Sequence, residues 1–444
     1  MASSVRPGGF APPVLGARLL PAAPHGRLVG GRGPQSPSAV PSTSQAELVS
    51  RASQSVAIVG GGIAGLASAL ALKKIGIPVV VLEKSEEMRT EGSALGLFGN
   101  AWRALDALGV GNQLRRDHML LNGVQLKSSD GSELTSFSFD DCGQGRREFR
   151  GVYRTALVQA LEGALDGGTV VYGIDVTGVQ MSKRGLPQLI QQCGKPIPCR
   201  MVVGADGARS CIAQALGLKA PNFAGYIALR GVCRLDVESL PVRSGSIVQA
   251  LGKGVRAGLY PLTAHDVYWF VCYNALEGEP RLSPEERKKM AMSLVRGWSG
   301  GWKELVEATD PVDISQNQVG DRWQFPGMPV GRGLVTLAGD ALHPMTPNMG
   351  QGGCVALEDA VQLGRVLQNA GKFAIGTSEL ESQLREYEKE RLNRVMPLTV
   401  ESNIRGFLLQ LDSELVCRTR NFIVSNFFSP KGFLKHTAYD CGDL

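Results

Sequence analysis

The feature that most constrains this 444-residue chain is a cluster of glycines between two apolar runs. Val56–Val59 leads into residues 60–65, and a second apolar run, Val79–Leu82, ends at the single acid Glu83. The small and apolar residues in between are typical of a closely packed helix, which we expect over residues 63–75. A strand, a glycine turn, a helix and a second strand in this order predict a β-α-β unit of an α/β fold.

The glycines of this turn have the spacing Gly60-x-Gly62-x-x-Gly65, which is typical of a dinucleotide-binding loop. The first glycine permits a tight turn, the second lets the backbone approach a pyrophosphate, and the third lets the helix pack closely on the strand. The first helical N–H groups, including those of Ile63 and Ala64, then face the phosphates together with the positive end of the helix dipole.

The acid that follows the second strand narrows the choice of dinucleotide. Glu83 lies 18 residues after Gly65, where a carboxylate can bind ribose hydroxyls, and Lys84 follows it. A carboxylate repels a 2′-phosphate, so the loop suits NAD or FAD rather than NADP. The alternative is an accidental glycine turn, which the surrounding strands and helix disfavour.

A second glycine- and proline-rich segment, residues 339–353, follows the apolar run 334–338. That run brings Asp340 to the C-terminal end of a strand, where α/β folds bind ligands. Glycines at 350, 352 and 353 precede a helix whose N-terminus would stabilise a flavin edge that becomes negative on reduction. A generic sharp loop is the alternative, and length and composition alone do not exclude it.

A third motif, Gly-Ala-Asp-Gly-Ala-Arg-Ser at residues 204–210, lies between the other two. With these three motifs in this order, the chain resembles the class A flavoprotein monooxygenases, the FAD enzymes similar to para-hydroxybenzoate hydroxylase, over residues 56–394. Within that family it looks most like plant plastid-type monooxygenases related to zeaxanthin epoxidase and salicylate hydroxylase.

The resemblance implies roles for individual residues. Glu83 should hold the adenosine ribose of FAD, Asp340 the ribityl chain, and the backbone of Gly350, Gly352 and Gly353 should meet the flavin ring. Two further residues match the family. Arg154 lies at the start of a predicted helix and should contact FAD. Asp206 lies in the third motif and should be near the pyrophosphate, where it would influence the use of NAD(P)H.

The activity that the resemblance implies is an FAD-dependent monooxygenase, with NADPH or NADH as the transient reductant. It would insert one oxygen atom from O2 into a small aromatic or isoprenoid substrate through a C4a-hydroperoxyflavin. Two alternatives stay open: a flavin-dependent reductase or dehydrogenase of the same fold, and a non-catalytic FAD-binding protein. His343 is a weak catalytic candidate, since a structural role in its turn is favoured. No metal site is expected, and the oligomeric state is a monomer or a homodimer.

The substrate wall should come from alternating apolar and polar residues between positions 225 and 273, which predict a large antiparallel sheet. The candidates are Tyr226, Arg230, Tyr260, Pro261, Trp269 and Phe270. Each of these is equally compatible with an ordinary core position. No clear set of residues for binding a substrate carboxylate emerges from the pattern.

We therefore expect an α/β chain with a Rossmann-like FAD-binding domain, an inserted antiparallel β-sheet substrate domain and C-terminal helices. The FAD-binding domain should comprise residues 53–122, 151–220 and 326–370. A β-rich insertion at 123–150, a substrate-binding sheet at 221–325 and a helical region at 371–444 complete the prediction. The apolar and basic tail, residues 407–428, should pack against the body, with a membrane surface or a partner as the alternative.

The net charge of the chain and the composition of its first 52 residues indicate which partners and which compartment to expect. The net charge of +6 arises largely in residues 1–51, which carry five arginines and one acid, and the remaining chain has 42 basic and 40 acidic residues. A nearly neutral body gives no footprint for nucleic acid. Residues 1–52 are Ser-, Pro- and Arg-rich, which predicts a disordered transit peptide for the chloroplast stroma, with the mitochondrion as the alternative. No apolar run is long enough to predict a transmembrane span.

Overall fold

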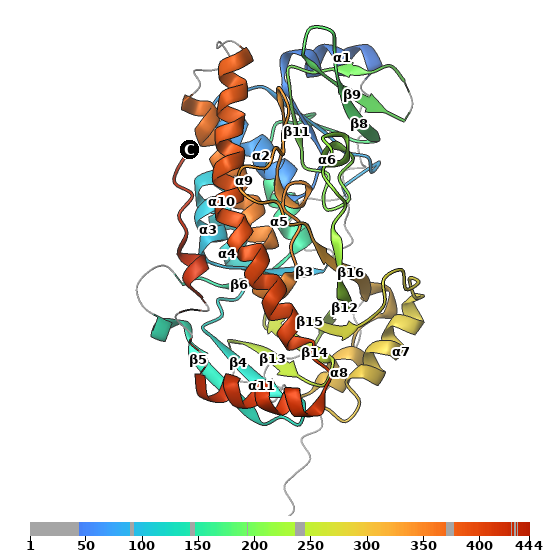
Figure 1. The fold of residues 1–444 in the computed structure, drawn as a ribbon, viewed down its shortest axis with the longest axis vertical. Helices are drawn as coiled ribbons and strands as arrows, with labels where there is room; N and C mark the ends of the chain where they lie inside the picture. The colour runs from blue at the N-terminus through green and yellow to red at the C-terminus, as the bar shows by residue number, and fades with distance from the viewer. Residues whose placement is uncertain are drawn as a thin grey trace, which may run out of the picture.

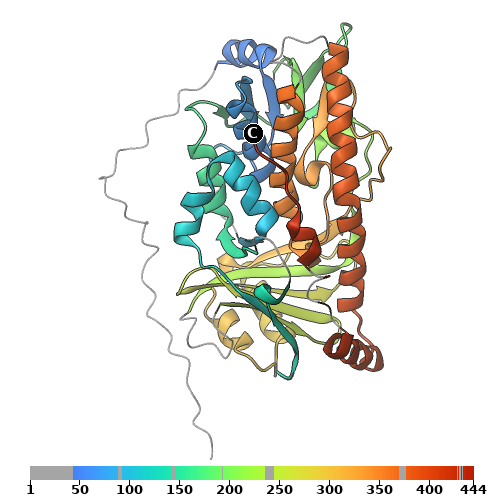
Figure 2. The same cartoon turned by 90° about the vertical axis from the view of Figure 1, so that its left-hand side faces the viewer.

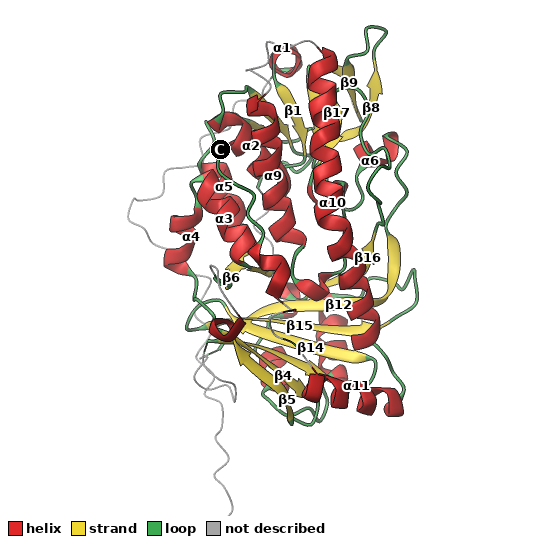
Figure 3. Cartoon of the chain, turned by 60° about the vertical axis from the view of Figure 1, so that its left-hand side comes forward, coloured by secondary structure: helices red, strands yellow, loops and turns green. Residues whose placement is uncertain are grey.

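Two sheets organise the molecule, and one long helix runs beside both of them (Figures 1 and 2). The computed structural model describes residues 44–88, 93–142, 147–192, 194–235, 245–369, 377–427, 429, 432 and 434–444. Figure 3 shows helices gathered around the first sheet in the upper part of the molecule, with the second sheet below them. This arrangement confirms the predicted α/β class.

The first sheet has five parallel strands in the order β17-β11-β1-β2-β7. Their bounds are β1 Val56–Val59, β2 Val79–Leu82, β7 Val170–Val171, β11 Met201–Gly204 and β17 Val335–Leu337. The strands are continuous apolar runs because helices or a second layer cover both faces of the sheet. One face packs on α2 (Ile63–Lys74), α9 (Gly352–Asn369) and α10 (Thr377–Leu409).

The opposite face of this sheet packs on α1 (Gln45–Gln54), α6 (Cys211–Ala215) and a three-stranded sheet. The strands of that small sheet are β8 Val176–Met181, β9 Pro187–Gln191 and β10 Ile197–Pro198. The remaining elements of this half are α3 Gly99–Leu108, α4 Gly111–Asp117, α5 Arg154–Gly163 and the antiparallel pair β3 Ala94–Leu97 and β6 Arg150–Tyr153.

The second sheet, which we call the substrate sheet, has seven strands in the order β16-β12-β15-β14-β13-β4-β5. Their bounds are β4 Gly123–Ser128, β5 Glu133–Ser138, β12 Asn222–Arg234, β13 Ser246–Leu251, β14 Val255–Pro261, β15 Asp266–Asn274 and β16 Ser315–Asp321. All neighbours pair antiparallel except β4 and β13, which are parallel, so the sheet is mixed at this point. One face packs on α7 (Pro284–Leu294) and α8 (Trp302–Glu307), and the other faces the first half of the molecule.

The predicted disorder of residues 1–52 is wrong at its C-terminal end, because α1 is an ordered helix. Ser44 caps it by accepting a hydrogen bond from the Glu47 N–H at 3.2 Å. Leu48 and Ala52 lie one helical turn apart and are buried against the first sheet and its covering strands. Such a two-residue apolar stripe is too short to stand out in the sequence pattern. Residues 1–43, the rest of the predicted leader, lie outside the described residues.

The C-terminal helices extend along both sheets and then turn under the second one. In Figure 2, α10 runs the length of the molecule, and α11 (Glu414–Phe427) lies across its lower end. Arg420 is buried in α11 and donates a hydrogen bond to the Gly252 carbonyl at 3.2 Å, so the tail packs against the body. Leu415 and Phe422, in contrast, are exposed. In the described part of the chain no helix is both long and apolar enough to cross a membrane.

Candidate functional site

A cavity of about 840 Å³ lies between the two halves of the molecule. The glycine turn of residues 60–65 and the segments 204–210 and 339–353 each contribute to its lining on one side. The substrate sheet contributes the other side. One cavity therefore joins the predicted cofactor loops to the predicted substrate wall.

The glycines of the first loop are required by close backbone contacts. A Cβ added at Gly65 would lie 1.9 Å from the Gly60 carbonyl oxygen, and one added at Gly60 would lie 2.5 Å from the carbonyl oxygen of Ala205. Gly339, at φ +59°, approaches Ala64 so closely that an added Cβ would lie 2.6 Å from the alanine Cβ. The three motifs therefore touch one another, and we call their meeting point the glycine cradle.

The cradle presents open hydrogen-bond donors to the cavity. Gly62, Ile63 and Ala64 line it at the N-terminus of α2, where no side chain caps the helix. A Cβ at Gly62 would meet nothing within 4 Å, so space remains beside these N–H groups. Gly350 and Gly352 line the cavity where α9 begins. Two helix starts with accessible backbone fit the anionic pyrophosphate and the flavin edge of FAD.

Glu83 stands at the end of β2 beside this turn. Its Oε2 accepts a hydrogen bond from the Gly61 N–H at 2.7 Å, and its Oε1 accepts one from the Ser85 N–H at 3.0 Å. A carboxylate oxygen can accept more than one hydrogen bond, so this position is compatible with binding a ribose hydroxyl. Glu83 and Lys84 lie beside the cavity rather than among its lining residues.

Asp340 and Arg154 both line the cavity on the cradle side. The protein surrounding Asp340 raises the pKa of its carboxyl group by desolvation, while His343, Arg230 and Arg154 act in the opposite direction. An acid that faces a cavity within reach of positive groups is suited to accept hydrogen bonds from the hydroxyls of a ribityl chain.

Asp206 lies in the loop of the third motif, next to the residues of that loop that line the cavity. Its Oδ2 accepts hydrogen bonds from the Cys211 N–H at 2.8 Å and the Ile212 N–H at 3.4 Å, at the start of α6. The neighbouring Ala205 and Gly207 line the cavity, whereas Asp206 does not. In this conformation its carboxylate fixes the loop that the cavity contacts.

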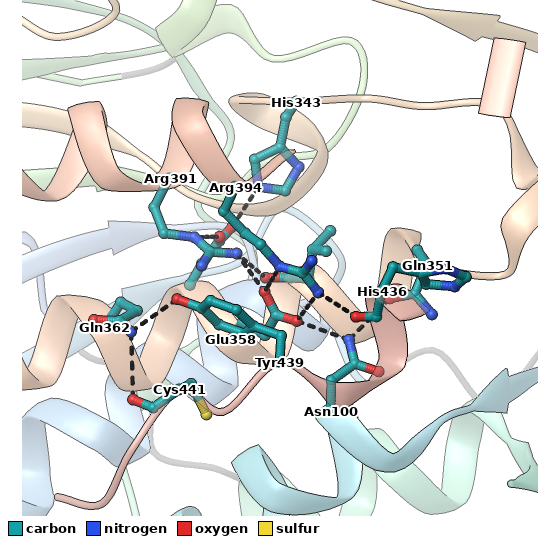
Figure 4. Close-up of polar contacts among 12 residues, drawn as sticks. Asn100, His343, Gln351, Glu358, Gln362, Arg391, Arg394, His436, Tyr439 and Cys441 are labelled. Atoms are coloured by element: carbon teal, nitrogen blue, oxygen red, sulfur yellow. Dashed lines mark hydrogen bonds and ion pairs between the residues drawn. The ribbon is translucent and has the colours of Figure 1, made fainter. Parts of the chain in front are cut away.

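His343, the weak catalytic candidate, is buried outside the cavity lining (Figure 4). Its Nε2 lies 2.6 Å from Oδ2 of Asp359, which also accepts a hydrogen bond from the Gly339 N–H at 2.7 Å. Burial acts to raise the pKa of Asp359, but His343 and Arg391 together hold that pKa at about 2. The histidine thus fixes the turn after Asp340, as the structural alternative proposed.

A buried ion network that sequence reasoning missed anchors α9 beside the cradle (Figure 4). Glu358 on α9 pairs with Arg391 and Arg394 on α10, each at 2.9 Å, and accepts a hydrogen bond from Asn100 on α3 at 2.7 Å. The ring of Tyr439 lies 4.2 Å from the Arg394 guanidinium. The signal available in the sequence was the pair of adjacent acids Glu358 and Asp359 within an apolar helix. Because such charges are buried only when they are paired, they indicate buried cationic partners elsewhere in the chain.

The predicted substrate residues separate according to the face of the sheet that they occupy. Arg230, Tyr260 and Phe270 line the cavity as expected. Trp269 does not: it is fully buried on the opposite face, where its Nε1 donates to Thr309 Oγ1 at 2.8 Å. The Trp269 prediction is therefore wrong, because successive residues of a strand point to opposite faces and Phe270 takes the cavity side.

Two more predicted residues, Tyr226 and Pro261, are also absent from the lining. Tyr226 is buried behind it, and its hydroxyl accepts a hydrogen bond from Asn348 Nδ2 at 3.0 Å. Asn348 itself lines the cavity and was not predicted. Among the other lining residues that the sheet contributes are Gln249, Arg256 and Tyr268, which the sequence pattern did not single out.

These loops and this cavity define an FAD-binding protein, and comparison with known proteins agrees. A family model described as FAD binding domain matches residues 53–402. The chain belongs to the class A flavin monooxygenase family and is an FAD-dependent oxidoreductase.

Individual relatives cover most of the chain. It is 32% identical to Monooxygenase 2 of Arabidopsis thaliana over 410 residues, which is 88% of this chain and 98% of that protein. It is 30% identical to chloroplastic zeaxanthin epoxidase of an Oncidium hybrid, covering 77% of this chain and 53% of that one. The crystal structure of Klebsiella pneumoniae HpxO with FAD and uric acid has a TM-score of 0.76 at 25% identity, over 86% of this chain and 96% of that one.

Proposed function

We propose that the protein is an NADPH- or NADH-dependent monooxygenase that inserts one atom of O2 into a small aromatic or isoprenoid substrate. The observation that carries this proposal is the single cavity that joins the glycine cradle to the substrate sheet. A substrate on the sheet would lie next to a flavin bound at the cradle, which an oxygen transfer between them requires.

The residues on the cradle side fit FAD. The N–H groups at Gly62–Ala64 would face its pyrophosphate, Glu83 its adenosine ribose, and Asp340 its ribityl chain, with Arg154 nearby. The segment 350–353 would contact the ring. Bound FAD supplies the capacity to take a hydride from NAD(P)H and to activate O2.

The residues on the substrate side fit a planar, partly polar compound. Tyr260, Tyr268 and Phe270 form an aromatic wall whose neighbouring rings lie 4.7 and 6.3 Å apart. Burial raises the pKa of the Tyr260 and Tyr268 hydroxyl groups, so both stay neutral around pH 7. Such a wall excludes water, which protects a reactive oxygen donor from hydrolysis.

The relatives support the proposal and its location. Among the relatives, urate hydroxylases are named for hydroxylating urate, and zeaxanthin epoxidase is named for epoxidising zeaxanthin. The chloroplast location of the epoxidase and the composition of residues 1–52 favour the plastid stroma for this chain. Fusion of residues 1–52 to a fluorescent protein tests the plastid location. We expect fluorescence in chloroplasts, and fluorescence in mitochondria would contradict this location.

The activity is tested by following NADPH and NADH oxidation, O2 uptake and peroxide release on the same samples over a metabolite panel. We expect a compound that accelerates NAD(P)H oxidation and gains one oxygen atom from ¹⁸O2. Product formed without O2 would instead indicate a reductase or dehydrogenase. Bound flavin that no nicotinamide reduces, with any compound of the panel, would indicate a binding protein.

A further inference from the structure

We propose that Asn348 is a positioning residue that holds the segment 350–353 at a fixed place relative to the substrate sheet. It acts through hydrogen bonds to α10 and to two strands of the sheet. This inference rests on the proposed function for the place of the flavin ring beside segment 350–353. It gives a role in oxygen transfer to a residue that the sequence pattern did not single out.

Asn348 lies in the short helical turn η5 (Pro347–Met349), two residues before Gly350. It lines the cavity and is buried, with 8% of the residue exposed. The turn continues directly into segment 350–353. A displacement of Asn348 therefore displaces the backbone that would contact the flavin ring.

The side-chain amide of Asn348 joins this loop to three other elements. Its Nδ2 donates hydrogen bonds to the Ser402 carbonyl on α10 at 2.7 Å and to the Tyr226 hydroxyl on β12 at 3.0 Å. Its Oδ1 accepts a hydrogen bond from Nη2 of Arg256 on β14. One amide thus links the flavin loop, the long helix and the substrate sheet.

These partners allow only one orientation of the amide. A backbone carbonyl only accepts hydrogen bonds, and a guanidinium only donates them. Nδ2 must therefore face Ser402, and Oδ1 must face Arg256. A leucine at this position would pair with neither, and an aspartate would place an oxygen against the Ser402 carbonyl oxygen. Asparagine satisfies the helix and the sheet together.

The helix α10 is adapted to this contact. The hydroxyl of Ser402 donates to the Thr346 carbonyl at 2.7 Å, which is a second hydrogen bond between α10 and the same loop. One turn further on, a Cβ added at Gly406 would lie 2.2 Å from Nδ2 of Asn348. The helix approaches the amide closely because glycine has no side chain. Since α10 runs beside both halves of the molecule (Figures 1 and 2), it holds loop and sheet in one arrangement.

Loss of the amide would loosen the loop without dismantling the glycine cradle. Buried polar groups left without partners are costly, so the loop would move to find others. A displacement of about 1 Å is enough to slow a reaction between two bound groups roughly 100-fold. The contacts at Gly60, Gly65 and Gly339 do not involve Asn348, so the pyrophosphate site would remain. The expected signature is bound FAD whose ring is poorly held.

The test compares bound FAD in the unmodified protein and in Asn348→Leu, which removes every polar contact of the amide. After removal of free FAD, iodide quenching of flavin fluorescence measures the accessibility of the ring and needs no turnover. We expect the quenching constant to rise about threefold and the Kd for FAD to change less than about threefold, since only the ring is released.

Two further variants disturb the same amide differently. Asn348→Asp keeps an acceptor for Arg256 but opposes the Ser402 carbonyl, and it should give an intermediate rise in quenching. Gly406→Ala displaces the amide without removing a polar group, and it should also raise the quenching constant. If Asn348→Leu does not fold, these two variants carry the comparison.

Each type of substitution has a matched control. Asn112→Asp changes an exposed amide on α4, far along the chain from the flavin loop. Gly163→Ala adds a methyl group in α5 where nothing lies within 4 Å. Both controls should show the quenching constant of the unmodified protein.

A second readout uses any compound of the metabolite panel that is oxygenated. NAD(P)H that is oxidised without oxygen transfer releases hydrogen peroxide. In Asn348→Leu we expect the yield of product per NAD(P)H to fall roughly tenfold or more, with a matching rise in peroxide. A substitution that only lowered the amount of folded protein would leave this ratio unchanged.

Unchanged quenching in both Asn348→Leu and Gly406→Ala would overturn the proposal. It would also be overturned if stability and FAD content fell together while the remaining flavin stayed as shielded as before, because Asn348 would then be only structural. If the ring becomes accessible while no compound is oxygenated, the positioning role stands and the proposed function fails. If a compound is oxygenated with the same product yield in all variants, the proposed function stands and the positioning role fails.

Discussion

The glycine cradle and the substrate sheet form opposite sides of one cavity, but they are specified in different ways. The cradle is defined by backbone: Gly60, Gly65 and Gly339 each sit where a Cβ would clash with a neighbouring segment. The substrate sheet is defined by side chains that one strand register brings together, such as Arg230 opposite Phe270. The comparison teaches that the cradle can be recognised from short glycine motifs in the sequence, whereas the composition of the opposite wall depends on the register of strands that are far apart in the sequence.

The largest expected effect comes from adding one methyl group to the cradle. Gly65→Ala places a Cβ against the Gly60 carbonyl oxygen, so the α2 helix must shift away from β1. We expect FAD affinity to fall at least 100-fold and stability to fall by roughly 1–3 kcal/mol, the usual cost of overpacking. Flavin content after purification and equilibrium dialysis with FAD measure this.

The matched control is Gly163→Ala in α5, where an added Cβ meets nothing within 4 Å. That variant should bind FAD like the unmodified protein, since alanine favours a helix more than glycine does. Similar FAD loss in both variants would show that the cradle is not specified by close backbone contact.

The next effect concerns side chains on the cradle side. Asp340→Ala removes the acid that faces the cavity, and we expect FAD affinity to fall by roughly 10- to 100-fold, as for loss of a charged hydrogen-bond partner. Glu83→Ala should weaken binding less, because Glu83 lies beside the cavity and also bonds to the Gly61 N–H. Fluorescence titration with FAD ranks the two variants, and the reverse order would contradict these assignments.

The pH dependence of folding stability tests the packing of the helices that support the cradle. Burial first, and then Arg405 and Arg394, lower the pKa of His436 from 6.5 to about 3. The folded state therefore resists protonation of His436, so its contribution to stability is complete above pH 6.5 and is lost progressively as pH falls toward 3. We expect a loss of about 2 kcal/mol between about pH 7.5 and about pH 5 from this group.

The measurement is chemical unfolding of FAD-loaded protein at the two pH values, compared between the unmodified chain and His436→Gln. The variant should lose less stability on acidification. Identical pH dependence of the two proteins would exclude His436 as the group responsible.

The smallest effect tests which face of the substrate sheet meets the cavity. Trp269→Phe removes the hydrogen bond to Thr309 and should cost about 1 kcal/mol of stability. It should not change the affinity of the FAD-loaded protein for benzoate or benzamide. Phe270→Leu, one residue further on, should change the affinity for benzoate or benzamide several-fold. An affinity change confined to Trp269→Phe would reverse the assignment of faces.

The sequence predicted the cradle well because its signals are local. The bounds of β1 and β2 agree with the apolar runs, and the helix begins at Ile63 as expected. The three motifs meet in space because each follows a strand of one parallel sheet, and parallel strands end at one edge.

The rest could not be predicted for specific physical reasons. Alternation identified a strand around Trp269 and Phe270 but not which of the two faces the cavity, because both faces of that sheet are covered. Arg256 and the arginine partners of Glu358 were missed because they interact across large separations in sequence. The helix α1 was missed because it depends on only two buried side chains for its docking.

The most direct test of the central claim is the stoichiometry of flavin bound to the full chain after incubation with FAD and removal of the excess. We predict a yellow protein with one FAD per chain, and a markedly lower ratio in Gly65→Ala under the same conditions. A folded protein that stays colourless after this treatment would contradict the convergence of the three motifs on one flavin.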